Sequence, residues 1–241
     1  MTDRTRRALL PSAGNTGDRV LLDPEESHHA ARVLRLKRGD ALNVFDGAGR
    51  EWAATIEDVT GDRVAVVLGQ EVEGRVEAPL RVVLYQANVR PEKLEWVLQK
   101  GTELGVAAFR IVVTERVEAP APSPARLTRY RRILLTACKQ SGRRVLPELA
   151  VGGIETPGAD VAAIVLTQEA PALGKVLQAE PPHEVWIVVG PEGGFTDAEL
   201  SALAGRGFLA ASLGPRVLRT ETAGAVAAAV VFHTWGDLGP V

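Results

Sequence analysis

At 241 residues the chain is long enough for one large domain, or for a large domain beside a small one, and its 46% hydrophobic residues support a packed core. No apolar run reaches the roughly 20 residues of a membrane span, and the N-terminal segment is too polar for a secretory signal, so we expect a cytoplasmic protein without a membrane contact. A single cysteine and four scattered histidines exclude an internal disulfide and offer no metal-ligand spacing, so no metal is expected.

Residues 1–75 are predicted to form a small β-rich domain. Short strand-like runs at 41–45, 51–57 and 63–68 are separated by turn signals such as Asp46-Gly47, and residues 24–36 have the pattern of a short helix. The polar stretch 71–79 has little apolar pattern and is the expected linker.

A basic cluster lies on the helix predicted in this first domain and just beyond its end. His28, Arg32 and Arg35 lie at helical positions i, i+4 and i+7, and Lys37 and Arg38 come directly after them. Such a cluster is either a solvated helix face or a contact for RNA phosphates, and the residues alone do not decide between the two.

From residue 80 onward the pattern changes to strands alternating with helices. Strands are predicted at 81–87, 109–114, 161–167, 185–190 and 208–213, and helices at 91–103, 124–141, 172–178, 196–204 and 221–235. This alternation is typical of a parallel sheet covered by helices, so the fold class predicted for 80–241 is α/β.

Positive charge is concentrated in one segment of a chain whose net charge is only −2. Residues 119–147 contain seven basic residues and no acidic one. On a helical period Arg129 and Arg132, with Arg143 beyond them, lie mainly opposite the apolar face, so we expect them to be free to meet RNA phosphates. Cys138 is expected in the core.

Two loops rich in glycine and proline follow apolar runs near the end of the chain. The first contains VGPEGGFTDAEL (189–200) and the second SLGPRVLRTETA (212–223). Glycines let backbone N–H groups approach a ligand closely, and loops at the carboxyl ends of parallel strands are where open α/β sheets bind ligands. The phosphate-binding patterns of nucleotide enzymes are missing, which disfavours a doubly wound nucleotide-binding enzyme. Thr196 and Glu199 have the spacing of a capping box.

This loop pair resembles the cofactor site of the SPOUT methyltransferases. Its sequence is most similar to that of the family that methylates N3 of a uridine in 16S ribosomal RNA. The stretch QKGTELGV (99–106) supports the resemblance. The resemblance implies a C-terminal trefoil-knot domain over 80–241, a small PUA-like β-barrel over 1–75, and a homodimer. It also implies S-adenosylmethionine as cofactor, with 16S ribosomal RNA or the small ribosomal subunit as partner.

The resemblance further implies which residues contact the cofactor: Leu166, Thr167, Val189, Gly190, Glu192, Gly194, Ser212, Leu213, Gly214, Val217, Leu218, Thr222 and Ala223. Arg219 is the first catalytic candidate, because a fixed guanidinium can hold the negative charge that spreads over the uracil carbonyls once N3 loses its proton. Glu221 either orients that arginine or accepts the proton. A surface ion pair between the two is the bland alternative. Two other functions remain open: a knotted methyltransferase acting on transfer RNA or on a ribose hydroxyl, and a non-catalytic RNA-binding assembly factor.

Overall fold

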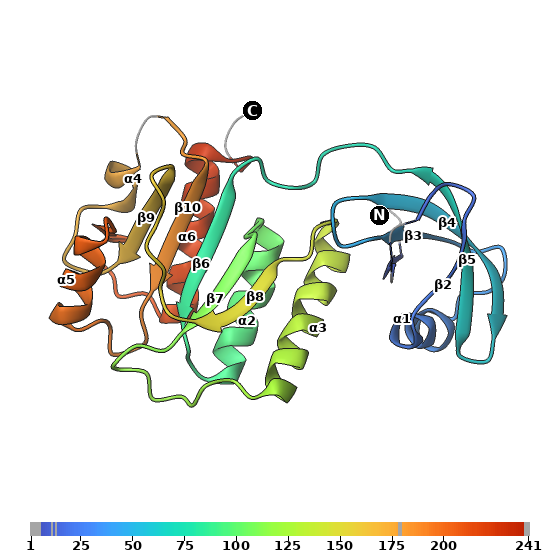
Figure 1. The fold of residues 1–241 in the computed structure, drawn as a ribbon, viewed down its shortest axis with the longest axis horizontal. Helices are drawn as coiled ribbons and strands as arrows, with labels where there is room; N and C mark the ends of the chain where they lie inside the picture. The colour runs from blue at the N-terminus through green and yellow to red at the C-terminus, as the bar shows by residue number, and fades with distance from the viewer. Residues whose placement is uncertain (1–5, 11, 13, 178–179, 239–241) are drawn as a thin grey trace. The chain divides into compact units, whose positions relative to one another are not determined.

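The computed structural model describes residues 6–10, 12, 14–177 and 180–238, and the chain divides into two compact units (Figure 1). The division falls between Glu77 and Ala78, and the segment Cys138–Leu146 belongs with the first unit although it lies far along the chain. The sequence predicts that the chain passes from the first domain to the second once, between residues 75 and 80. The return of Cys138–Leu146 was not predicted, because pairing across such a separation leaves no local pattern.

The first unit is built on a mixed five-stranded sheet in the order β1-β3-β4-β5-β2. β1 runs parallel to β3, and the other neighbours are antiparallel. Trp52 and Phe45 have no exposed surface, which places both in the core. The strands are β1 (Arg7–Leu9), β2 (Arg19–Leu21), β3 (Ala41–Phe45), β4 (Glu51–Thr60) and β5 (Arg63–Glu71).

The helix predicted over 24–36 is divided in the structure. α1 (Pro24–His28) begins after Asp23, whose carboxylate accepts a hydrogen bond from the Glu26 N–H at 2.8 Å, and a π-helical turn covers His29–Val33. Arg35 then adopts a φ of +53°, in the left-handed region that ends right-handed helices. In the predicted basic cluster, His28 therefore ends α1, Arg32 lies in the π-helical turn and Arg35 lies beyond it, so the three do not share one regular helix face.

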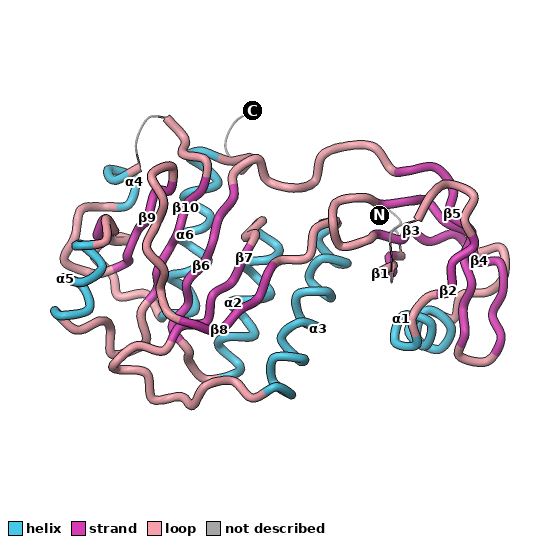
Figure 2. Tube along the Cα trace, in the orientation of Figure 1, coloured by secondary structure: helices cyan, strands magenta, loops and turns pink. Residues whose placement is uncertain are grey.

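The second unit is built on an all-parallel six-stranded sheet in the order β11-β9-β10-β6-β7-β8 (Figure 2). The predicted α/β class is thereby confirmed. β8 was not predicted, because four of its five residues are exposed and no apolar run marks it. The strands are β6 (Arg81–Ala87), β7 (Ala108–Val112), β8 (Glu148–Gly152), β9 (Val161–Leu166), β10 (Glu184–Val189) and β11 (Leu209–Ala211).

Helices cover both faces of this sheet. Leu94, Tyr130 and Phe232 bring three helices onto one face, and Leu203 packs with Phe208 on the other. α6 approaches β6 closely, since a Cβ added at Gly224 would lie 3.2 Å from Oε1 of Gln86. The helices are α2 (Pro91–Leu104), α3 (Pro124–Ser141), α4 (Leu173–Val176), α5 (Asp197–Gly205) and α6 (Thr220–Trp235).

The residue just after β11 is hydrogen-bonded to the segment that leads into α4. The Ser212 N–H donates to the Pro171 carbonyl, and the Ser212 carbonyl accepts from the Leu173 N–H, both at 2.8 Å. α6 then runs back against α2, β10 and β6. The small residues Ala227 and Ala228 are fully buried there, which suits a helix in a crowded place. Threading of α6 through a loop of the chain stays a prediction.

Candidate cofactor and RNA site

A cavity of about 1190 Å³ lies at the carboxyl ends of β9, β10 and β11. The two glycine-rich loops form much of its wall, as expected for ligand sites in open parallel sheets. Its volume slightly exceeds the roughly 300–1,000 Å³ typical of small-molecule pockets. The predicted residues that line it are Leu166, Thr167, Val189, Gly190, Glu192, Gly194, Leu213, Gly214, Val217, Leu218, Ala223 and the catalytic candidate Arg219.

Three predicted site residues do not line the cavity. Ser212 is buried and uses both backbone groups on the neighbouring loop, Thr222 is half-buried on α6, and Glu221 lies in the first turn of that helix. The positions of Glu221 and Thr222 follow from the helix that begins at Thr220, because its first turn places only some side chains toward the loops, whereas Ser212 is held by its two backbone bonds.

The three cavity glycines serve different physical needs. Gly194 and Gly214 have φ of +68° and +98°, a region that side-chain-bearing residues rarely adopt, while a Cβ at either position would meet open space. At Gly190 a Cβ would lie 2.9 Å from the Phe195 ring. Two glycines therefore shape the backbone of the loops, and the third allows the first loop to fold over Phe195.

A buried polar chain joins the two loops beneath the cavity. The Thr220 hydroxyl donates to the Gly190 carbonyl at 2.6 Å and accepts a hydrogen bond from Nε2 of Gln86 at 2.9 Å. Gln86 and Thr220 are 1% and 6% exposed, so these bonds are shielded from water. Neither residue was singled out from the sequence, because a lone glutamine in an apolar strand gives no sign of a partner so far along the chain.

Arg116, in the loop after β7, fastens the first glycine-rich loop from outside. Its guanidinium donates to the carbonyls of Gly193 at 2.8 Å and Phe195 at 3.2 Å. Nearby, Glu199 both completes the predicted capping box with Thr196 and accepts from the Glu115 N–H at 3.0 Å. The capping box is confirmed, and the C-terminal part of the loop is held by Arg116 and by the start of α5.

The charged groups at the rim differ from the expected arrangement. Arg219 is exposed and makes no ion pair with Glu221; instead, Lys93 on α2 lies 3.6 Å from Oε2 of Glu221 and 2.8 Å from Oε1 of Glu192. The hydrogen bond with Glu192 raises the pKa of Lys93 and lowers that of Glu192. Lys93 lines the cavity and was missed from the sequence, since one lysine in a helical first turn is unremarkable.

The predicted RNA contacts fall into two groups. His28, Arg32 and Arg35 are exposed on the first unit, where Arg32 pairs with Asp62 at 2.6 Å. Arg129 and Arg132 are exposed on α3. Nε and Nη2 of Arg129 both bond the Glu95 carboxylate, the latter at 2.8 Å. Exposed pairs of this kind cost little to break, so they leave both surfaces able to meet phosphates.

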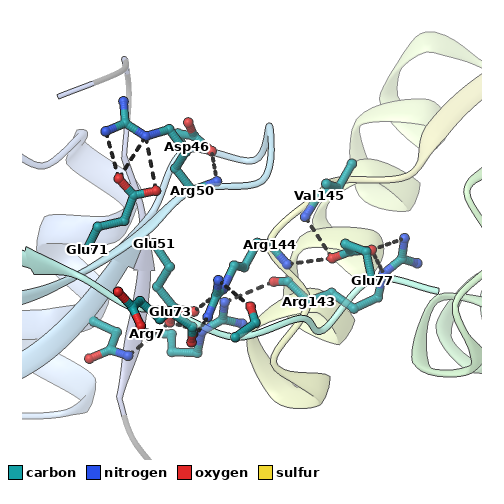
Figure 3. A network of polar contacts seen from close by, with 12 residues as sticks. Arg7, Asp46, Arg50, Glu51, Glu71, Glu73, Glu77, Arg143, Arg144 and Val145 are labelled. Atoms are coloured by element: carbon teal, nitrogen blue, oxygen red, sulfur yellow. Dashed lines mark hydrogen bonds and ion pairs between the residues drawn. The ribbon is translucent and has the colours of Figure 1, made fainter. Parts of the chain in front are cut away.

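Arg143 is a correction to the sequence prediction. It lies beyond the end of α3, is only 5% exposed, and its Nε donates to Oε2 of Glu77 at 2.9 Å (Figure 3). Neighbouring Arg144 and Arg7 converge on Glu51 in the same buried network, at 3.0 and 2.8 Å. The helical period was extended past Ser141, where the helix ends, and this placed Arg143 wrongly on an exposed face.

Other expectations concern metals, membranes and the cysteine. The described residues contain no cluster of three or more metal-ligating side chains. Within the same part of the chain, no helix is both long and apolar enough to cross a membrane. Burial raises the pKa of the Cys138 thiol to about 11, as suits a core residue.

Comparison with known proteins decides the family. A model of the RNA methyltransferase domain matches residues 76–232, and a model of the RNA methyltransferase PUA domain matches residues 22–77. The ribosomal RNA small subunit methyltransferase E of a Synechocystis strain is 36% identical over 225 residues, covering 88% of this chain and 72% of the relative. The chain belongs to the ribosomal RNA small subunit methyltransferase E family. The Mycobacterium tuberculosis relative of the same name is 35% identical, covering 90% and 87% of the two chains.

Solved structures of this methyltransferase family match nearly the whole chain. The ribosomal RNA small subunit methyltransferase E of Neisseria gonorrhoeae, bound to S-adenosyl methionine, has a TM-score of 0.91 and 31% identity, covering 97% and 99% of the two chains. A Legionella pneumophila protein in complex with the same cofactor has a TM-score of 0.90 and 35% identity, covering 98% and 100%. The chain therefore contains both of the parts predicted from the sequence, a PUA domain and an RNA methyltransferase domain.

Proposed function

We propose that this methyltransferase uses S-adenosylmethionine to methylate N3 of a specific uridine in 16S ribosomal RNA. The observation that carries the proposal is the convergence of both glycine-rich loops, the second of which carries Arg219, on one cavity at the carboxyl edge of the parallel sheet. The family supports methyl transfer to ribosomal RNA of the small subunit. The choice of uridine N3 rests on the chemistry of the site and on the resemblance of its loops.

The residues present fit the cofactor. Gly194 and Gly214 place backbone at the cavity wall without side chains, and Leu166, Leu213 and Leu218 supply apolar surface for an adenine ring. When bound, S-adenosylmethionine supplies a methyl group activated by a sulfonium charge. The chain's own part is to hold this group and the uridine in line, since positioning alone removes a large share of the barrier.

Arg219 and Glu221 are proposed to act separately. A uridine N3 is a weak nucleophile until it loses its proton, after which the negative charge spreads to the carbonyls on both sides. Arg219 is exposed, lines the cavity and has no competing ion pair among the described residues, and we propose that its guanidinium donates planar hydrogen bonds to those oxygens. Glu221 is the proposed acceptor of the proton: it lies between Thr220 and Ala223, which line the cavity, and its Oε2 is 3.6 Å from the Lys93 ammonium. Apo geometry of this kind commonly tightens when substrate binds.

RNA is proposed to be held by both units. The PUA match over residues 22–77 includes His28, Arg32 and Arg35, and α3 offers Arg129 and Arg132. We also propose a homodimer working in the cytoplasm, where small subunits assemble. A knotted methyltransferase on another RNA would use the same cavity but yield another modified nucleoside, and a non-catalytic assembly factor would bind RNA without consuming cofactor.

Primer extension on ribosomal RNA tests the proposal in cells. N3-methyluridine cannot form its Watson–Crick pair and stops reverse transcriptase. We expect a stop on 16S ribosomal RNA from the wild type that disappears when the gene is deleted and returns on complementation. A stop pattern that is identical in both strains would contradict the proposal.

A further inference from the structure

Lys93 joins two carboxylates that come from different parts of the second unit. Glu192 belongs to the first glycine-rich loop, and Glu221 lies in the first turn of α6. The Lys93 ammonium is 2.8 Å from Oε1 of Glu192 and 3.6 Å from Oε2 of Glu221. These two are the charged groups that face Lys93, and Arg90 adds a weaker positive field at Glu192. One ammonium therefore serves two carboxylates.

The charges of this group do not cancel. One ammonium and two carboxylates leave a net charge of −1, and the Glu221 side chain is 14% exposed, with its buried Oε2 at 3.6 Å from the Lys93 ammonium. A buried carboxylate oxygen is costly unless a partner compensates its charge, and Lys93 is the cation that the structure places beside this one. The single ammonium therefore compensates both carboxylates and lies closer to Glu192 than to Glu221.

A competing role for Lys93 is to bind an RNA phosphate. The ammonium lines the cavity, so access does not exclude this role. Its charge is already opposed by two carboxylates, however, and a phosphate would have to displace a 2.8 Å charge-assisted bond while approaching the same negative groups. The geometry thus favours holding carboxylates over binding an anion.

We infer that Lys93, Glu192 and Glu221 form one proton-accepting unit, in which Lys93 is the positioning residue and Glu221 takes the proton from uracil N3. The inference rests on the proposed function. The N3–H bond breaks and its proton passes to a Glu221 oxygen. The freed electron pair forms the bond to the transferred methyl carbon, whose bond to sulfur breaks with its pair remaining on sulfur.

The first test measures the contact without any reaction. The chain has five lysines, so carbon-13 labelling of lysine in cofactor-free protein gives few signals, and Lys93→Met identifies the signal of Lys93. The carboxylates raise the pKa of Lys93 above its ordinary value, and we expect Glu221→Gln to lower it measurably. A Lys93 titration that is identical in wild type and Glu221→Gln would overturn the inference.

The second test measures single-turnover methyl transfer at saturating RNA and cofactor. We expect Lys93→Met to slow the step by about tenfold or more, part of the range for general-base catalysis, with both dissociation constants little changed. Lys93→Arg should restore much of the rate. Lys93→Met should add little to a Glu221→Gln enzyme, because the residue acts through Glu221. The matched control is Lys100→Met on the same helix, which removes only a pair with Glu103 at 2.9 Å.

The outcomes separate the two levels of argument. If the wild type transfers no methyl to uridine N3, the proposed function fails, whatever Lys93 does in the titration. If the wild type is active but Lys93→Met matches Lys100→Met, the inference alone fails. A Lys93→Met enzyme whose RNA affinity falls and whose salt dependence flattens would show a phosphate ligand and also overturn the inference.

Discussion

Replacing Thr220 with valine tests the buried polar chain beneath the cavity. Valine keeps the shape of threonine but removes the hydroxyl, which donates to Gly190 and accepts from Gln86 at 2.6 and 2.9 Å. Both partners then lose a buried hydrogen bond. A buried polar group left unsatisfied costs about 1–3 kcal/mol, and Gln86 keeps only a long contact of 3.4 Å to the Ala87 carbonyl. We expect the free energy of unfolding to fall by about 2–4 kcal/mol.

The same change should loosen the loop that carries Gly190. We therefore expect the cofactor dissociation constant, measured by calorimetry, to rise along with the loss of stability measured by urea unfolding. The matched control is Thr234→Val on the exposed part of α6, which removes a 2.9 Å bond to the Val230 carbonyl within the same helix. If Thr220→Val and Thr234→Val behave alike in both assays, the polar chain does not organise the loop.

Three further predictions follow from the charged residues. Arg219→Lys should slow single-turnover methyl transfer by about 10²-fold with little change in either dissociation constant, and a near-wild-type rate would refute the catalytic role. Alanine at Arg129 or Arg132 should reduce the slope of log K for RNA binding against log salt concentration by about 0.7 per residue, and a slope equal to that of the wild type would make α3 only a solvated face. Arg143→Ala should instead lower the free energy of unfolding. Burial would raise the pKa of Glu51, but hydrogen bonds from its arginine and asparagine partners lower it overall. The ionised Glu51 therefore stabilises the fold above about pH 4.5, and this contribution is lost as pH falls through the lowered pKa. The stability of Glu51→Gln should lack this dependence on pH in acid unfolding.

Local patterns predicted the framework closely. The bounds expected for β3, β6 and α3 are those of the structure, because each has a strong apolar period and clear end signals. β1 and β2 have three residues each and β8 is exposed, so none carries enough pattern to be seen.

The site was predictable to the extent that it follows the chain locally. The two loops could be recognised from their glycines. The structure places every expected cofactor residue except Ser212 and Thr222 on the cavity wall. The partners of these loops come from elsewhere in the chain: Lys93, Gln86 and Arg116 meet them only through the fold. Arg143 was predicted to be exposed but is buried, because the sequence alone does not reveal that it pairs with Glu77, 66 residues earlier in the chain.

Analysis of the modified nucleoside tests the central claim most directly. The purified protein is incubated with labelled S-adenosylmethionine and small subunits from a strain lacking the gene, and the RNA is digested to nucleosides for mass spectrometry. The account predicts that the label appears in N3-methyluridine from 16S ribosomal RNA, and that Arg219→Lys reduces it. Label in a ribose-methylated or otherwise modified nucleoside, or none in RNA at all, would contradict the account.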